Sequence, residues 1–375
     1  MKVGIIARRL VGKPFGIGRY IQYLLKYWDR IAEPGDSFVL YTPKPLARES
    51  VPDSSSFRCE VVGPDVQGIV WESLVLPLRI GPVDVLFGPS YTVPLAYRGR
   101  MVVATHSVNE AQRGTHPWWY KLTYTPWYRA SARRAERVIV PSRSTLYDVQ
   151  RYYGVPEDRI DVVLEGVDES FQPVGDADLL RRTRQKYFGS DRPYILFVGK
   201  QSQRRNIPNL IAAFGMLRRR HAIPHGLLLM GPNVLGLPLE ALAREHGVAD
   251  SVVQLDESFP DHRGIIPVYA AADLYAYPSA YDGFSLTLVE AMACGVPAVT
   301  VDRAAVSEIA GGCALMVEEP TAEALAGAMA RVLMEPELRA ALRAKGLERA
   351  RALQWEQTAR GTLNVLRRVA EEARA

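Results

Sequence analysis

Short runs of β-branched and aliphatic residues recur along the chain, and a stretch with the spacing of an amphipathic helix follows most of them. In the first half of the chain the predicted strands are 3–7, 38–41, 83–87, 101–105, 138–140 and 160–164. In the second half they are 194–198, 226–230, 252–255, 274–277 and 296–300. Strands that alternate with helices in this way form parallel sheets that helices cover on both faces. The pattern therefore predicts the α/β class with doubly wound parallel sheets.

The alternation breaks between Glu165 and Arg192, where Gly, Pro and Asp occur at short intervals before a new strand begins. Such a composition is typical of a linker. At roughly 150 residues per domain, the 375 residues of the chain fit two domains. We therefore expect two Rossmann-like domains, residues 1–170 and 171–354, that face each other across a cleft. Residues 355–375 have helical spacing and no strand after them, which predicts a closing helix that packs back on the first domain.

Composition narrows the class of protein and its location. The chain is 48% hydrophobic and 23% charged, as in soluble globular proteins. Its three cysteines form no Cys-x-x-Cys pair, so we expect a reducing compartment without disulfides or zinc. The chain start lacks the pattern of a secretory signal, and no apolar run is long enough to span a membrane. These features predict a cytoplasmic protein. The net charge of +5 suits an anionic ligand, a lipid surface or nucleic acid equally well.

Two loops have the composition of phosphate-binding loops. The first, residues 13–20, follows the first strand and contains Gly16 and Gly18, with Arg19 beside them. Glycines at a strand-to-helix turn let backbone N–H groups approach a phosphate, although a flexible turn without a ligand has the same pattern. The second loop follows strand 194–198 and contains Lys200 and Arg205, two cations that suit a diphosphate. Solvated surface charge is the alternative interpretation of this loop.

The segment 278–297 carries two acidic residues at a strand-to-helix turn. Asp282 lies on the loop after strand 274–277, and Glu290 lies in the following helix, 286–294. Carboxylates at these positions can accept hydrogen bonds from sugar and ribose hydroxyls, while the backbone amides of Gly283, Phe284, Ser285 and Leu286 donate. A helix cap with one exposed carboxylate is the structural alternative.

This segment resembles the E-x7-E signature region of retaining glycosyltransferases of family 4. Further motifs of that family lie along nearly the whole chain: the loop 16–20, His106 after strand 101–105, and the segments 131–142, 166–168, 199–206 and 355–356. The resemblance implies the GT-B architecture of two Rossmann-like domains. It also implies a nucleotide-sugar substrate, a glycan or lipid-linked acceptor, and no cofactor, metal ion or nucleic acid.

The resemblance also implies roles for individual residues. Gly16 and Gly18, with Lys200 and Arg205, would hold the diphosphate. Glu290 would bind the ribose of the nucleotide. Asp282 and the backbone of residues 283–286 would position the transferred sugar, and His106 would lie on the sugar and acceptor side. The expected catalytic residues are accordingly His106, Asp282, Lys200 and Arg205.

Three positions depart from the family pattern. Asp282 stands where the signature usually has Glu, Ser107 where His106 is commonly followed by Asp, and Glu165 where Asn is frequent. Asp282 is one methylene shorter than Glu and still expected to reach a sugar hydroxyl. His106 is expected to lack the carboxylate that would orient it.

The function that these residues predict is metal-independent, retaining transfer of a hexose to an acceptor hydroxyl. The leading donors by family analogy are GDP-mannose and UDP-hexoses, and the acceptor is a bacterial surface polysaccharide or glycolipid. Two alternatives remain: a non-catalytic nucleotide-sugar sensor, and a glycoside hydrolase that uses Asp282 and Glu290 as its acidic pair. The hydrolase interpretation leaves both phosphate-type loops unexplained.

Residues 117–137 combine aromatic side chains with arginines. Such a helix can lie in an anionic membrane interface, which would suit a lipid-linked acceptor at the inner face of the membrane. A partly buried helix with a charged outer face is the alternative.

Overall fold

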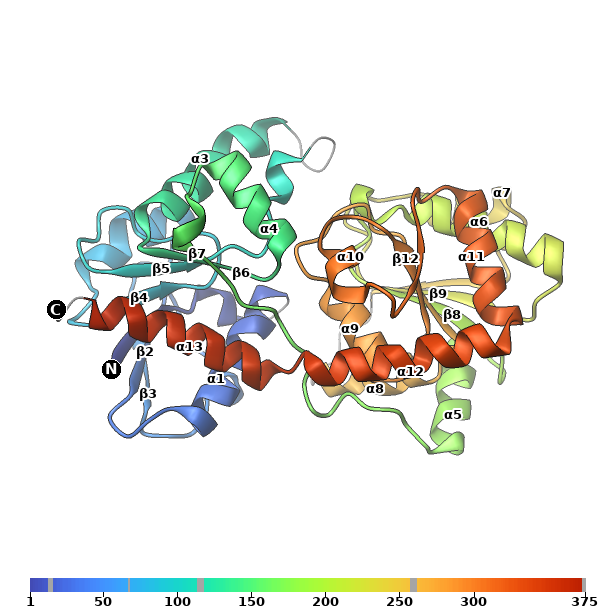
Figure 1. Cartoon of the computed structure of the whole chain (residues 1–375), viewed down its shortest axis with the longest axis horizontal. Coiled ribbons are helices and arrows are strands. Elements are labelled where there is room, and N and C mark those ends of the chain that lie inside the picture. Colours follow the sequence, from blue (N-terminus) through green and yellow to red (C-terminus); the bar gives the residue numbers. More distant parts are fainter. Residues whose placement is uncertain (13–15, 67, 113–117, 257–261, 373–375) are drawn as a thin grey trace. The chain divides into compact units, whose positions relative to one another are not determined.

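The computed structural model describes residues 1–12, 16–66, 68–112, 118–256 and 262–372. It divides the chain into two compact units, which Figure 1 shows. The first unit is Met1–Gly166 together with Trp355–Ala375, and the second is Val167–Gln354. The chain thus leaves the first unit after Gly166, where the sequence pattern places the boundary after residue 170, and returns to it at Trp355.

The first unit contains a sheet of seven parallel strands in the order β3-β2-β1-β4-β5-β6-β7. Its strands are β1 (Lys2–Ile6), β2 (Ser37–Thr42), β3 (Phe57–Val61), β4 (Val85–Gly88), β5 (Met101–Ala104), β6 (Arg137–Val140) and β7 (Ile160–Val162). Six of them agree with the predicted strands to within two residues at each end. The sequence did not predict β3, because this edge strand is half exposed and carries Arg58 and Glu60.

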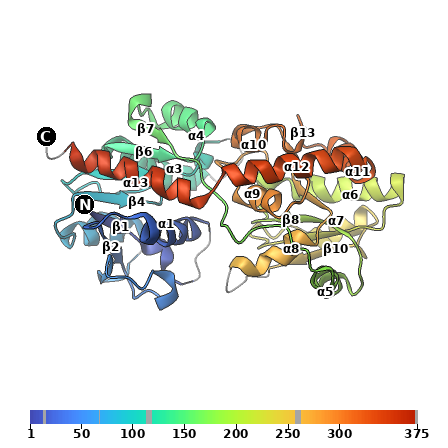
Figure 2. The same cartoon turned by 60° about the horizontal axis from the view of Figure 1, so that its bottom comes forward.

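Helices cover both faces of the first sheet (Figure 1). The helices are α1 (Ile17–Ile31), α2 (Gly68–Val70), α3 (Trp118–Arg134), α4 (Arg143–Asp148) and α13 (Trp355–Glu371). Short 3₁₀ and π turns lie at Arg8–Leu10, Arg48–Ser50, Trp71–Val75, Leu76–Leu78, Asn109–Ala111, Val149–Tyr153 and Glu157–Arg159. Figure 2 shows α13 beside α1, and the buried indole of Trp28 donates a hydrogen bond to the carbonyl of Ala359 over 2.8 Å.

The second unit contains a sheet of six parallel strands in the order β10-β9-β8-β11-β12-β13. Its strands are β8 (Tyr194–Val198), β9 (Gly226–Met230), β10 (Val252–Leu255), β11 (Leu274–Tyr277), β12 (Ala298–Val301) and β13 (Leu315–Val317). The first four have the predicted bounds. The sequence missed β13, a three-residue edge strand that is too short to give a clear pattern.

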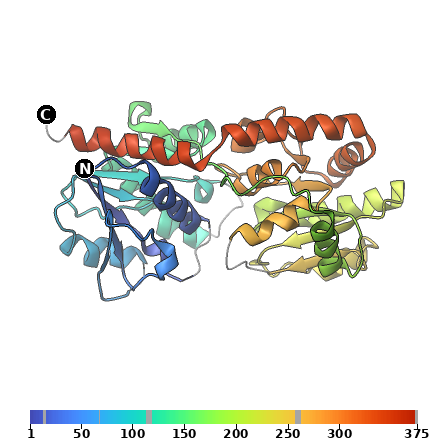
Figure 3. The same cartoon turned by 90° about the horizontal axis from the view of Figure 1, so that it is seen from below.

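The second sheet is also covered on both faces, by α6, α7 and α11 on one and by α8, α9 and α10 on the other (Figure 1). The helices are α5 (Ala177–Phe188), α6 (Ile207–His221), α7 (Leu239–Glu245), α8 (Ile266–Ala270), α9 (Leu286–Ala293), α10 (Ala304–Ala310), α11 (Ala322–Met334) and α12 (Pro336–Ala352), with 3₁₀ turns at Gln203–Arg205 and His262–Ile265. Figure 3 shows the green helix α5 beside the yellow-orange α8. Because α5 lies between Glu165 and Arg192, the predicted linker is wrong in part: it contains a helix capped by Asp176.

The predicted fold class, two α/β units that each have a doubly wound parallel sheet, is confirmed. Every residue of β5 and β8 is buried, as expected of central strands with helices on both faces. In sheets of this kind ligands bind outside the carboxyl ends of the strands, where loops lead into helices. We therefore expect the functional residues at the carboxyl ends of the strands of each sheet.

Candidate active site

The loop that leaves β8 in the second unit depends on two glycines with positive φ, Gly199 (143°) and Gly231 (128°). A Cβ atom built on Gly231 would lie 2.4 Å from the carbonyl oxygen of Gly199, so the two backbone segments pack too closely for any side chain. The loop continues through Lys200, which is exposed, to Asn206, whose side-chain amide donates to the carbonyl of Pro278 over 2.9 Å. This bond ties the loop after β8 to the loop after β11.

Two arginines of this loop converge on Asp282. Arg204 Nη1 lies 2.5 Å from Asp282 Oδ1, and Arg205 Nη1 lies 2.6 Å from Asp282 Oδ2. The hydroxyl of Tyr277 donates to the same Oδ2 over 2.5 Å, and the guanidinium carbon of Arg205 lies 4.7 Å from the centre of the Tyr277 ring. Arg205, predicted for the diphosphate, and Asp282, predicted for the sugar, are thus direct partners here. Arg204 is a member of the cluster that the sequence analysis did not assign to the site.

The opposite charges of this cluster stabilise each other, although burial disfavours the ionised form of each group. Burial works to raise the pKa of the Asp282 carboxyl, but Arg204 and Arg205 outweigh it, and the pKa lies below its ordinary value. Burial lowers the pKa of Arg205 to about 10, against the opposing effect of Asp282. At neutral pH Asp282 is therefore an anion and Arg205 a cation.

Glu290 lies in α9, and both of its carboxylate oxygens have partners. Its Oε1 lies 2.7 Å from His262 Nε2, and its Oε2 accepts a hydrogen bond from the Tyr269 hydroxyl over 2.8 Å. Burial, with the Glu290 charge beside it, raises the pKa of the Tyr269 hydroxyl well above its ordinary value, so Tyr269 is a donor at neutral pH. Sequence analysis did not identify His262 or Tyr269, which precede Glu290 by 28 and 21 residues and match no motif.

Several polar atoms at this edge of the second sheet lack a protein partner. Ser285 lies immediately before α9 with a φ of 85°, a left-handed conformation that is uncommon for serine and is found at binding sites. Among the described residues, four buried atoms of this edge accept or donate no hydrogen bond: Gln201 Oε1, Ser202 Oγ, Arg205 Nε and Ser285 Oγ. Buried polar atoms are normally paired, so unpaired ones indicate a place for a ligand or ordered water.

In the first unit, Gly16 lies immediately before α1 with a φ of 48°, and Gly18 is buried in the first turn of that helix. Residues 13–15 of the predicted phosphate-type loop lie outside the described residues. The N–H groups of the first turn of a helix have no partner within the helix, which suits an anion. Gly16 and Gly18 are thus where the sequence places them, at the carboxyl edge of β1.

His106 follows β5, and both of its ring nitrogens have partners. Nδ1 lies 2.7 Å from Oε1 of Glu165, and Nε2 lies 2.9 Å from the carbonyl oxygen of Pro89. The ring of Tyr20 packs edge-on against the imidazole, with 4.6 Å between ring centres. The expectation that His106 lacks an orienting carboxylate is therefore wrong. Glu165, which follows β7, supplies it, and the sequence concealed this because the two residues are 59 positions apart.

A second buried carboxylate in the first unit also escaped the sequence analysis. Glu72 is 2% exposed, pairs with Arg8 over 3.2 Å and accepts a hydrogen bond from the Thr92 hydroxyl. Burial raises the pKa of Glu72, and Arg8 opposes that shift. The neighbouring Arg9 is exposed and donates from Nε to Ser90 Oγ over 3.0 Å. The carboxyl edge of the first sheet thus carries arginines as well as His106.

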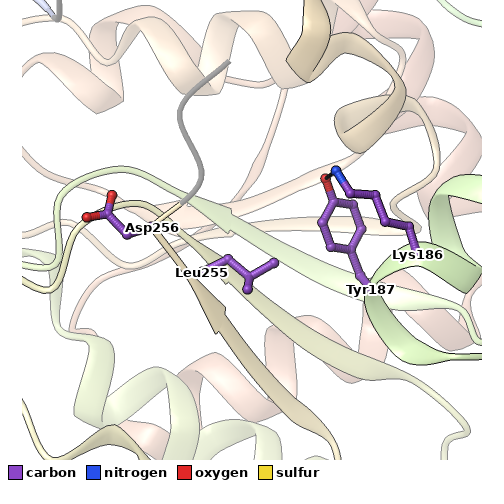
Figure 4. Close-up of a pocket in the computed structure, with 4 residues that line it drawn as sticks. All are labelled: Lys186, Tyr187, Leu255 and Asp256. Atoms are coloured by element: carbon purple, nitrogen blue, oxygen red, sulfur yellow. Dashed lines mark hydrogen bonds between the residues drawn. The ribbon is translucent and has the colours of Figure 1, made fainter. Parts of the chain in front are cut away.

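A hollow of about 390 Å³ lies elsewhere in the second unit, between α5 and the end of β10 (Figure 4). Lys186, Tyr187, Leu255 and Asp256 line it, and the amine of Lys186 lies 3.3 Å from the Tyr187 hydroxyl. None of the predicted site residues lines this hollow.

Within the described ranges, no three His, Cys, Asp or Glu side chains are grouped as ligands for a metal ion. No helix in the part of the chain that the structure describes could span a membrane.

Two α/β units, each with a doubly wound parallel sheet, are the architecture of the GT-B class of folds. Solved structures share this fold over almost the whole chain. Sucrose-phosphate synthase from Thermosynechococcus elongatus is 21% identical, with a TM-score of 0.78 and coverage of 98% of both chains. Anabaena HepE, solved in complex with UDP-glucose, is 18% identical, with a TM-score of 0.76 and coverage of 98% of this chain and 100% of the other.

Family models identify the particular group within this class. The model described as Glycosyltransferase Family 4 matches residues 16–171, and the model described as Glycosyl transferases group 1 matches residues 181–349. The chain belongs to glycosyltransferase family 4, as its motifs predict.

Curated relatives match over part of their length. O-antigen chain mannosyltransferase B of Escherichia coli is 28% identical over 61% of this chain. D-inositol 3-phosphate glycosyltransferase of Rhodococcus opacus is 33% identical over 62% of this chain. The chain spans 60% of the length of the first relative and 53% of the second.

Proposed function

We propose that this protein transfers a hexose from a nucleoside-diphosphate sugar to a hydroxyl group of an acceptor. The observation that carries the proposal is the cluster of Arg204, Arg205 and Asp282 at the carboxyl edge of the second sheet, with Lys200 in the same loop. Guanidinium groups bind phosphate oxygens through paired, charge-assisted hydrogen bonds. Membership of family 4 supports sugar transfer as the reaction.

The donor would bind mainly through the second unit. Arg205 Nε and the hydroxyls of Ser202 and Ser285 are buried donors without a protein partner, and phosphate oxygens could accept their hydrogen bonds. Glu290 keeps lone pairs beyond those that His262 and Tyr269 occupy, because an ionised carboxylate has about four acceptor positions. We propose that these lone pairs accept the ribose hydroxyls. The remaining proposed contacts are Gly16 and Gly18 to the diphosphate, and Asp282 with the backbone of residues 283–286 to the sugar.

The proposed transfer retains the configuration at the anomeric carbon. The bond between C1 and the diphosphate oxygen breaks, and the acceptor oxygen forms a new bond to C1 from the same face. The acceptor proton passes to the oxygen of the departing phosphate. Lys200 and Arg205 stabilise the negative charge that develops on that phosphate. We propose that these cations take the place of a metal ion.

The names of the relatives guide the proposed substrates. Because the Escherichia coli relative is an O-antigen mannosyltransferase, we propose GDP-mannose or a UDP-hexose as donor. The proposed acceptor is a growing surface polysaccharide or glycolipid at the inner face of a bacterial membrane.

In α3, Trp119 is 54% and Leu122 is 69% exposed, and the exposed Pro126 and Arg129 continue the same helix face. We propose that this face contacts anionic lipid, since apolar side chains beside arginines suit that interface.

The test combines donor binding with turnover. Thermal unfolding is measured with GDP, UDP, dTDP and ADP, because a nucleotide at 100 times its Kd adds about 2.7 kcal/mol of stability. The nucleotide that raises the melting temperature most identifies the nucleotide-sugars to test as donors. Release of the nucleoside diphosphate from these donors is then measured in the presence of an acceptor extract. Stabilisation without release would indicate a sensor. Flotation with anionic vesicles, compared between wild type and Leu122→Ser, tests the α3 face independently.

A further inference from the structure

The two partners of His106 determine how many protons its ring carries. A backbone carbonyl can only accept, so Nε2 must carry a proton and donate it to Pro89. An ionised carboxylate can also only accept, so Nδ1 must carry a proton when Glu165 is an anion. If Glu165 is ionised, both partners are acceptors and the ring is an imidazolium.

The surroundings of the pair keep this arrangement fixed. The side chain of Glu165 is 7% exposed and that of His106 is 13% exposed, so water competes little for either group. Tyr20 and Tyr91 pack edge-on against the imidazole, at 4.6 and 5.7 Å between ring centres. Burial raises the pKa of the Tyr20 hydroxyl, so Tyr20 stays neutral and adds no charge of its own. An ionised Glu165 would balance the charge of a doubly protonated His106.

The position of the pair links it to the proposed reaction. His106 follows β5 and Glu165 follows β7, and β6 lies between these two strands in the sheet. Both side chains thus lie at the carboxyl edge of the first sheet, where a doubly wound sheet binds its ligand. Glu165 is also the residue before Gly166, after which the chain enters the second unit.

We propose that Glu165 is a positioning residue that holds His106 as an imidazolium with its ring plane fixed, so that His106 is not the base of the reaction. Both ring nitrogens carry protons and both protons are bound, so the ring has no lone pair with which to accept the acceptor's proton. What it offers a substrate is positive charge and its C–H edge. This inference rests on the proposed sugar transfer for its kinetic consequence, but the protonation itself is independent of any activity.

The direct test is NMR of the protein with ¹⁵N-labelled histidine. The chain has six histidines, and loss of signals in His106→Asn assigns those of His106. We expect two ring N–H protons for His106 at neutral pH in the wild type. In Glu165→Gln the amide can donate to Nδ1, so a neutral ring fits and we expect only the Nε2 proton. A single ring proton in the wild type would overturn the proposal.

Kinetics separate a positioning role from a structural one. Glu165→Gln preserves the size of the side chain and one hydrogen bond but removes the charge. We therefore expect a melting temperature close to that of the wild type. We expect kcat to fall about ten- to a hundredfold, which corresponds to the free energy of a hydrogen bond to a charged group. The donor KM should change little, and Glu165→Asp should restore part of kcat. Glu157→Gln, on an exposed turn of the same unit, is the matched control with unchanged kcat.

The outcomes distinguish this inference from the proposed function. An unchanged kcat in Glu165→Gln, with an active wild type, would refute the role of Glu165. A wild type that transfers no sugar from any donor would refute the proposed function, while the count of ring protons would still decide the protonation of His106.

Discussion

Replacing Asp282 by Asn should destabilise the second unit strongly, because the carboxylate is the counter-ion of two arginines. It accepts from Arg204 and Arg205 at 2.5 and 2.6 Å and is 8% exposed. An Asn side chain keeps the shape, but it carries no charge and turns an NH₂ group toward one of the guanidinium groups. Arg205 stays cationic at neutral pH, since its pKa is about 10. The variant therefore leaves a buried cation without its anion.

The size of the effect follows from the burial. Removing one partner of a buried ion pair costs about 3–5 kcal/mol, because the remaining charge stays desolvated. For a unit of this size, each 1 kcal/mol shifts the melting temperature by about 2–4 °C, so Asp282→Asn should lower it by roughly 6–20 °C. The matched control is Asp178→Asn, which breaks an exposed pair with Arg181 on α5 and should cost less than about 1 kcal/mol.

The difference in stability between the wild type and Asp282→Asn should also depend on pH, and it should become smaller in acid. The folded-state pKa of Asp282 is lowered, so its stabilisation is complete above the ordinary carboxyl pKa and is lost as the pH falls through the lower, folded value. Differential scanning calorimetry at pH 7 should therefore show the full gap between wild type and Asp282→Asn, and the gap should shrink below about pH 4. A loss at pH 7 no larger than that of Asp178→Asn would refute the reasoning.

Three further predictions concern the proposed reaction. Arg205→Ala should weaken nucleoside-diphosphate binding about ten- to a hundredfold in calorimetry and weaken binding of the free nucleoside much less. The control Arg182→Ala, which replaces an exposed arginine, should change neither affinity. Equal losses for both ligands would place Arg205 away from the phosphates. Sugar transfer should survive excess EDTA, and complete loss that magnesium or manganese restores would contradict metal-independent catalysis. Glu290→Ala should raise the donor KM with little change in kcat, since ribose contacts exist in ground and transition states alike; a fall in kcat at constant KM would assign Glu290 a different role.

The sequence by itself determined the fold class and most of its strands. Central strands such as β8 and β11 are buried on both faces, so they appear in the sequence as uninterrupted apolar runs. Edge strands β3 and β13 escaped prediction because an edge is half exposed or short, and its pattern is correspondingly weak. The helix α5 was missed because its polar residues outnumber its buried ones, Thr183 and Tyr187.

Motifs in the sequence also predicted single site residues, among them His106, Arg205, Asp282 and Glu290, but not the contacts that these side chains make. Only the tertiary structure paired Arg205 with Asp282 across 77 positions, His106 with Glu165 across 59, and Glu290 with His262 across 28. The physical reason is the parallel sheet, which brings the carboxyl ends of its strands to one edge whatever their separation along the chain. The charge states of Arg205 and Asp282 then follow from their pairing, because a neighbouring opposite charge and the loss of water decide which form of a buried group is stable.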